Sequence, residues 1–167
     1  MKVHLYLLRR VFSAYDALAK RRDFTGGLVL SRLGVDLGTV RIGIALSDEL
    51  EIVASPHTVI KSRGLDEDAE SVARIAQELE VCEIVVGMPR NMNGTYGPAA
   101  ERVRDFCNKL KKLVEVPILT WDERLSTAQA SRVLIDADLS RKKRKGCIDK
   151  SAAAIILQSY LDRAKNI

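Results

Sequence analysis

The stretch that decides the fold is LGVDLGTVRIGIALS, residues 33–47. Apolar residues dominate both of its halves and Gly38-Thr39 separates them, a pattern typical of two β-strands joined by a tight turn. Asp36 stands alone among the apolar residues of the first half. A buried carboxylate is costly unless it is paired, hydrogen-bonded or bound to a metal. Asp36 is therefore either a site residue or a turn aspartate that caps the turn beside it.

The pattern on either side of this stretch predicts an α/β domain. We expect strands over 28–37, 41–47 and 51–61, which short turns would join into an antiparallel meander. A helix over 66–79, a buried parallel strand over 83–86 and a helix that begins near Pro98 should follow. The chain then predicts a strand over 117–121, a helix from Ser126 to about Asp138 and a closing helix over 149–164. This order favours a five-stranded mixed sheet with helices on both faces.

The bulk composition fits one such domain. The chain has 167 residues, 47% of them hydrophobic, and only two His and three Cys. The cysteines form no C-x-x-C pair, which argues against a zinc site and a disulfide framework and favours a reducing, cytoplasmic setting. No apolar run approaches the length of a membrane span. We expect a domain over 28–167, preceded by an extension over 1–27.

The extension carries apolar residues at helical spacing, from Leu5 to Leu18, among basic ones. Three interpretations compete: a docking helix, an organellar targeting segment, or an upstream start codon that is not used. Asp16 and Asp23 weaken the targeting interpretation, because such peptides are poor in acidic residues. Gly26-Gly27 marks its end, and we expect no catalytic role for it.

Further acidic residues stand where an α/β sheet places its ligands. Asp122 and Glu123 directly follow the last predicted strand, and ligands bind at the carboxyl ends of parallel strands. Side chains alternate along a strand, so only one of the pair should share a site with Asp36. Asp149 opens the closing helix. Each acid also has a structural interpretation, since acids favour helix N-termini, Arg124 can neutralise the pair, and Asp is a favoured N-cap.

Taken together, the four acids favour a metal centre. Converging carboxylates repel one another unless a cation neutralises them, and Mg²⁺ or Mn²⁺ accepts carboxylate oxygens while keeping water and phosphate in its shell. Two such ions about 4 Å apart would suit phosphodiester hydrolysis. The candidate catalytic residues are Asp36, Asp122, Glu123 and Asp149, with Asp36, Glu123 and Asp149 as candidate metal ligands; the choice between Asp122 and Glu123 stays open.

Basic residues favour a nucleic-acid substrate. The net charge is +5, which suits a polyanionic partner but does not by itself require one. A Gly- and Asn-rich loop over 87–97 suits close approach to a phosphate backbone, although it could be an ordinary loop. The run 141–145 is either a phosphate contact or a solvated charge run. The candidate substrate-binding residues are Arg41, Arg90, Asn93, Arg124, Arg141, Lys142, Lys143, Arg144 and Lys145.

Four blocks in the chain resemble one family. They are GVDLGTVRIG (34–43), VVGMP (85–89) with Gly94 and Gly97, DERLST (122–127), and KGCID (145–149) leading into the last helix. In this order they resemble the YqgF/RuvX family of Holliday-junction resolvases, also described as pre-16S rRNA nucleases. The match covers roughly residues 31–164, and four co-ordered motifs are highly specific.

The resemblance implies a ribonuclease H-like fold and Mg²⁺ or Mn²⁺ chemistry on nucleic acid, with Asp36, the Asp122-Glu123 pair and Asp149 as the acidic set. Relative to other nucleases of that fold, Gly87 stands where an acid is expected, and an acid after the fifth strand substitutes for it. The resemblance favours 5′-end processing of precursor 16S rRNA over resolution of branched DNA.

Two other functions are compatible with parts of the sequence. Asp36-Leu37-Gly38-Thr39 also resembles the first phosphate loop of actin-like ATPases, but the chain lacks the second, similar domain that those proteins need. A non-catalytic factor that binds structured RNA or precursor ribosomal particles is the stronger rival. We expect no membrane association, and a monomer or a homodimer.

Overall fold

The computed structural model describes residues 31–90, 94–122 and 141–164, the last range with side chains from residue 152 onward. The predicted N-terminal helix and the predicted helix from Ser126 to Asp138 lie outside these ranges. The elements are β1 (Arg32–Leu37), β2 (Arg41–Ser47), β3 (Ala54–Lys61), α2 (Leu65–Glu78), β4 (Glu83–Met88), α3 (Pro98–Leu110), β5 (Ile118–Asp122) and α5 (Arg141–Ala164).

The five strands form one mixed sheet in the order β3-β2-β1-β4-β5. The pairs β1–β2 and β2–β3 are antiparallel, whereas β4 runs parallel to β1 and β5 parallel to β4. The predicted meander and the two predicted parallel strands are both confirmed. The turn between β1 and β2 needs its glycine, because a Cβ on Gly38 would overlap the carbonyl oxygen of Arg41.

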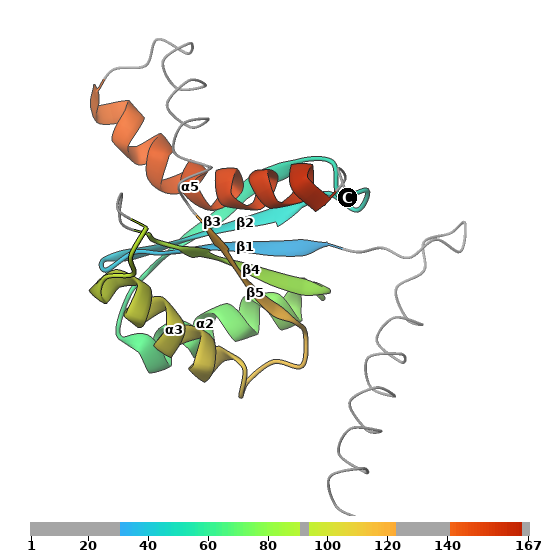
Figure 1. Ribbon diagram of the computed structural model, residues 1–167. Coiled ribbons are helices and arrows are strands. Elements are labelled where there is room, and N and C mark those ends of the chain that lie inside the picture. The colour runs from blue at the N-terminus through green and yellow to red at the C-terminus, as the bar shows by residue number, and fades with distance from the viewer. Residues whose placement is uncertain (1–30, 91–93, 123–140, 165–167) are drawn as a thin grey trace, which may run out of the picture.

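The sheet has a helical layer on each side (Figure 1). Helices α2 and α3 cover one face, where the main core gathers side chains such as Leu33, Val86 and Phe106. Helix α5 alone covers the other face among the described elements, and a smaller core there joins Val85 to Leu157. Residues that alternate along each strand therefore enter two different cores, which explains why these strands are nearly continuous apolar runs.

Helix α5 lies unusually close to the sheet. A Cβ on Gly34 would stand only 2.8 Å from the Ala153 carbonyl oxygen and 2.8 Å from the Leu157 Cβ. Real Cβ atoms do not approach so closely, so only glycine permits this packing. Ala153 and Ala154, both buried, supply small side chains on the helix side of the contact.

Several predicted boundaries were wrong. The first strand begins at Arg32 rather than at Leu28 and the fourth ends at Met88 rather than at Val86, while α2 and β5 are each shifted by one residue from the predicted ranges. The third strand begins at Ala54 rather than at Glu51, because 48–53 forms a turn in which the Asp48 carboxylate accepts hydrogen bonds from the Ile52 and Val53 amides. Helix α5 begins at Arg141 rather than at Asp149. Asp149 is therefore inside the helix and does not cap it, and the basic run 141–145 is helical rather than a loop. Within the described ranges, no helix has the length and apolarity to cross a membrane.

Candidate active site

Asp36 lies near the carboxyl end of β1, on the sheet face that α5 covers. It pairs with Gly43 of β2, and its neighbour Val35 pairs with Val86, so that Gly87 comes next along β4. The residues beside Asp36 on the two adjacent strands are thus both glycines. The residue is half-buried and takes part in a polar interaction. Asp36 thus stands at a carboxyl edge of the sheet, where the sequence predicted a site.

The sheet register separates Asp36 from Asp122. Trp121 pairs with Gly87, and it packs in the smaller core beneath α5. Asp122 pairs instead with Met88, whose side chain belongs to the core beneath α2 and α3. Since side chains alternate along a strand, Asp122 belongs to the opposite face from Asp36. Glu123 lies outside the described residues.

Helix α5 runs antiparallel to β1 and brings Asp149 toward the same edge. Tyr160 faces Arg32 at the start of β1, with the guanidinium carbon 5.4 Å from the ring centroid. Ala153, about two turns earlier in the helix, faces Gly34. Continuing in this direction, Asp36 is the next residue on that face of β1, and Asp149 is one turn before Ala153. The side chain of Asp149 lies outside the described part.

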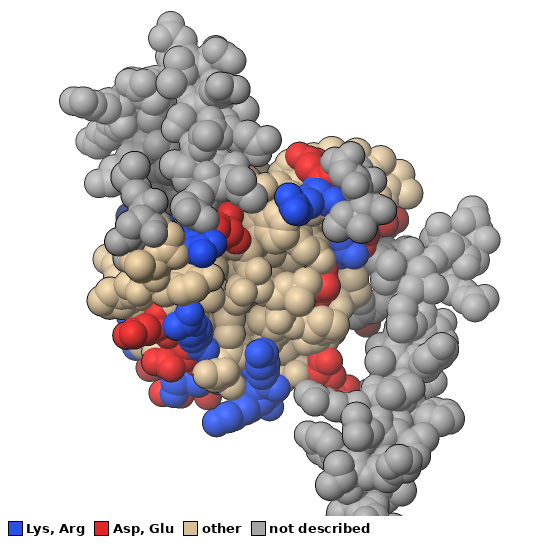
Figure 2. Space-filling model, viewed as in Figure 1, with Lys and Arg blue, Asp and Glu red and all other residues tan. Residues whose placement is uncertain are grey.

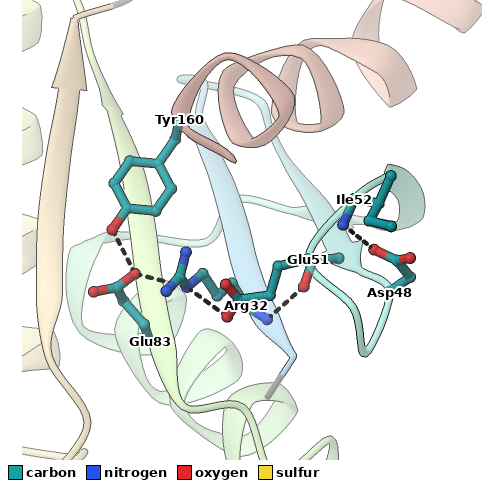
Figure 3. Close-up of polar contacts among 7 residues, drawn as sticks. Arg32, Asp48, Glu51, Ile52, Glu83 and Tyr160 are labelled. Atoms are coloured by element: carbon teal, nitrogen blue, oxygen red, sulfur yellow. Dashed lines mark hydrogen bonds and ion pairs between the residues drawn. The ribbon is translucent and has the colours of Figure 1, made fainter. Parts of the chain in front are cut away.

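A polar network fixes the other end of α5 (Figure 3). The Tyr160 hydroxyl donates a hydrogen bond to Glu83 at 2.7 Å, and the Arg32 Nε atom lies 3.1 Å from the same Glu83 oxygen and 3.2 Å from a Glu51 oxygen. Burial raises the pKa of Tyr160 to about 12, and the hydrogen bond to Glu83 acts in the same direction. The neutral phenol is therefore the form that the folded protein holds.

Further contacts attach α5 to the outer strands on both sides. The Trp121 indole donates to the Ser159 hydroxyl at 3.2 Å, and its ring meets that of Tyr160 edge-to-face at 5.3 Å. The Gln158 side chain accepts from the Ala54 amide at 2.8 Å and donates to the Ile52 carbonyl at 3.0 Å. These contacts were not predicted, because they join elements that are far apart in the sequence.

Arg90 follows β4 and holds the loop against the end of β5. Its Nη1 atom lies 3.3 Å from an Asp122 carboxylate oxygen, and its Nε atom donates to the Gly94 carbonyl at 2.8 Å. Its guanidinium also lies over the Tyr96 ring, with Arg104 of α3 beside the same ring. Arg90 was predicted as a substrate-binding residue, whereas Tyr96 and Arg104 were not. An exposed aromatic between two predicted elements was the only signal for them.

The other predicted substrate-binding residues divide in two. Arg41 is exposed at the start of β2, beside the β1–β2 turn, and takes part in an interaction of its own. Asn93, Arg124 and the side chains of 141–145 lie outside the described residues. On the face seen in Figure 2, charged side chains occupy the rim, over α2, α3 and the end of α5, around an uncharged centre.

The donor chemistry fits a hard divalent cation. Among the side chains that the structure describes, no three His, Cys, Asp or Glu lie together as a metal site, but two of the predicted ligands, Glu123 and Asp149, lie beyond those side chains. Burial disfavours the thiolate form of both described cysteines. Burial raises the pKa of Cys107 to about 11 and raises that of Cys82. Among the described residues, Asp36 and Asp122 are carboxylates near this edge, and Mg²⁺ and Mn²⁺ accept carboxylate oxygens.

Comparison with known proteins identifies close relatives. Residues 30–163 match the family model described as RuvX, Holliday junction resolvase. A protein of Halothermothrix orenii named "Putative pre-16S rRNA nuclease" is 53% identical over 130 residues, which cover 78% of this chain and 93% of that protein. A protein of the same name from Clostridium kluyveri is 50% identical over 131 residues, covering 78% of this chain and 96% of the relative.

A solved structure shows the same fold. It is T. thermophilus RuvC in complex with Holliday junction substrate, with a TM-score of 0.53 and 13% identity over 82% of this chain and 96% of that one. The expected ribonuclease H-like fold, with its five-stranded mixed sheet, is thus confirmed.

Proposed function

This chain belongs to the RuvX family of Holliday junction resolvases, and from that membership we propose that it is a nuclease that hydrolyses phosphodiester bonds with Mg²⁺ or Mn²⁺ held by Asp36, Glu123 and Asp149. The structural observation that supports this set of ligands is the antiparallel packing of α5 on β1. It directs Asp149 and Asp36, from opposite ends of the chain, toward one edge of the sheet.

The register supports Glu123 as the third ligand. Asp122 belongs to the α2/α3 face and pairs with Arg90, and the residue after it should return to the face of Asp36. We therefore assign Asp122 the task of orienting Arg90, and Glu123 that of binding metal. The alternation of side chains along β5 is the support for this assignment.

The chain's own groups would share the chemistry as follows. A bound divalent cation would supply a low-pKa water and neutralise charge on the phosphodiester oxygens. The three carboxylates would hold it and orient its shell. Arg90, which Asp122 and the Gly94 carbonyl fix in place, would donate hydrogen bonds to a phosphate oxygen beside the cut. The close packing at Gly34 would keep the ligands from β1 and α5 in register.

Precursor 16S rRNA is the substrate that we propose, with cleavage at its 5′ end in the cytoplasm, free or in precursor ribosomal particles. The support is the name that relatives of about half-identical sequence carry. Branched DNA is the second candidate, because the family description names Holliday junctions.

The test is hydrolysis of labelled precursor 16S rRNA and of a labelled four-way DNA junction, each with Mg²⁺, with Mn²⁺ and with EDTA. The proposal predicts metal-dependent cuts in the rRNA 5′ leader. The result could instead be symmetric cuts in the DNA junction and none in the rRNA, with the protein eluting as a dimer in size-exclusion chromatography. Branched DNA would then replace precursor rRNA as the proposed substrate. Binding of either substrate without cleavage under every condition would contradict the nuclease and favour a non-catalytic RNA-binding factor.

A further inference from the structure

A second charged cluster lies beside the candidate metal site, on the other side of the sheet edge. It consists of Arg90, Tyr96 and Arg104. Tyr96 is 47% exposed. The guanidinium carbon of Arg90 lies 5.2 Å from its ring centroid and that of Arg104 lies 4.6 Å away. Two like charges thus share one exposed ring.

The two arginines differ in how their charge is balanced. Arg90 pairs with Asp122 at 3.3 Å. Arg104, on the exposed surface of α3, makes no ion pair with any residue in the described ranges, and its contact there is the ring itself. Arg90, Arg104 and Asp122 therefore together carry one net positive charge. A cation–π contact orients a guanidinium without neutralising it, so the N–H groups of Arg104 stay available to an anion.

The position of the cluster indicates that the anion it would bind is a phosphate group of the substrate. Asp122 ends β5 and Gly94 precedes Tyr96 in the loop after β4, so Arg90 ties the cluster to the carboxyl edge of the parallel strands. Asp36 lies at the same edge on the opposite face. A strand whose scissile phosphate lay over Asp36 would pass this cluster with its neighbouring phosphates. Planar guanidinium groups match phosphate oxygens in two-pronged hydrogen bonds.

We propose that Arg104 and Arg90, held by Tyr96, form a second phosphate-binding site for a single-stranded segment of the substrate, next to the catalytic centre. The proposal rests on the proposed function, since it takes nucleic acid as the ligand. Tyr96 acts as a positioning residue, because its ring fixes the direction of both guanidinium groups. Arg104 is the direct contact.

The experiment measures binding of a fluorescein-labelled single-stranded RNA of mixed sequence to the full chain in EDTA, so that no cleavage occurs, across a series of KCl concentrations. Arg104→Gln should raise Kd about three- to tenfold and lower the salt slope by about 0.7, the value for one phosphate contact on a single strand. Arg74→Gln, which removes an exposed arginine from α2, is the matched control and should change neither quantity.

Two substitutions at Tyr96 test whether its aromatic ring positions the two arginines. Tyr96→Phe keeps the ring and should bind as the wild type does, whereas Tyr96→Leu should repeat the loss seen in Arg104→Gln. Additivity is the further check: once the ring is gone, Arg104→Gln should have a smaller effect than it has alone.

Wild-type Kd and salt slope in Arg104→Gln would overturn the proposal, as would equal binding by Tyr96→Leu and Tyr96→Phe. The proposed function would survive either result if the wild type still cleaved precursor rRNA or junction DNA with metal. Failure of the wild type both to bind this RNA and to cleave would overturn the two proposals together.

Discussion

Gly34 and Ala153 make the closest contact between the sheet and helix α5: a Cβ on Gly34 would stand 2.8 Å from the Ala153 carbonyl oxygen. Because the obstacle is backbone, a rotamer change cannot relieve it. The contact lies between Asp36 and the polar network at the other end of β1. The spacing between the proposed ligands Asp36 and Asp149 thus depends on Gly34, which has no side chain.

Substitution of this glycine should separate the ligands. Gly34→Ala forces the helix outward, and we expect it to lower the free energy of unfolding by about 1–3 kcal/mol and to reduce cleavage far more than the small unfolded fraction explains. Urea unfolding and cleavage assays on the same preparation check this. Wild-type values in both would contradict the packing described here.

The two neighbouring acids should behave differently. Glu123→Gln removes a proposed metal ligand and should reduce cleavage at least about a hundredfold. Asp122→Asn releases Arg90 without touching the metal and should cost less than about tenfold, mostly through weaker substrate binding. Single-turnover rates at saturating metal measure both. A larger loss in Asp122→Asn than in Glu123→Gln would refute the role that the register supports.

The basic run should set the salt dependence of binding. Replacing all five residues of 141–145 by Gln should lower the salt slope for single-stranded RNA by about three units, if most of them contact phosphates. The control is Lys111→Gln with Lys112→Gln, two exposed charges just beyond the far end of α3. An unchanged slope in the fivefold variant would remove the run from the binding surface.

Tyr160 should make stability fall at high pH. Its pKa is raised from 10.0 to about 12 by burial and by the hydrogen bond to Glu83, so the folded state holds the phenol proton more tightly than the unfolded chain does. The stabilisation is complete below pH 10 and is lost as the pH rises toward 12.

The comparison with Tyr160→Phe isolates this effect. The variant loses a hydrogen bond, and we expect it to be less stable at pH 8 by about 1 kcal/mol. The gap between wild type and variant should narrow from pH 10 upward in urea unfolding. Tyr96→Phe, the same change at an exposed ring, is the control. A gap that stays constant to pH 12 would show that the phenol proton is not held as described.

Much of the fold followed from the sequence because its strands carry strong local signals. The strand over 41–47 has the predicted bounds, since a glycine turn precedes it and its apolar residues enter two cores. The start of α5 was missed because five adjacent basic residues have no apolar periodicity and resemble a solvated run. Hydrophobic periodicity cannot indicate a helical turn in which every residue is charged.

The site was harder to predict because it depends on register. The sequence makes Asp36 a candidate by the cost of its charge, but the preference for Glu123 over Asp122 as the proposed ligand needed the pairing of Asp122 with Met88. Tyr96 and Arg104 meet only when the loop and α3 are placed. Contacts of this kind join separate elements, and no spacing rule within one element reveals them.

The most direct test of the central claim is metal-dependent cleavage by Asp36→Asn. The amide keeps the size of the side chain and removes the charge that the metal needs. Asp105→Asn, an exposed aspartate on α3, is the matched control, and calorimetric titration with Mn²⁺ accompanies the rate. We predict that Asp36→Asn folds, loses Mn²⁺ binding and cuts at least about a hundredfold more slowly, while Asp105→Asn matches the wild type. Wild-type cleavage by folded Asp36→Asn would contradict the account.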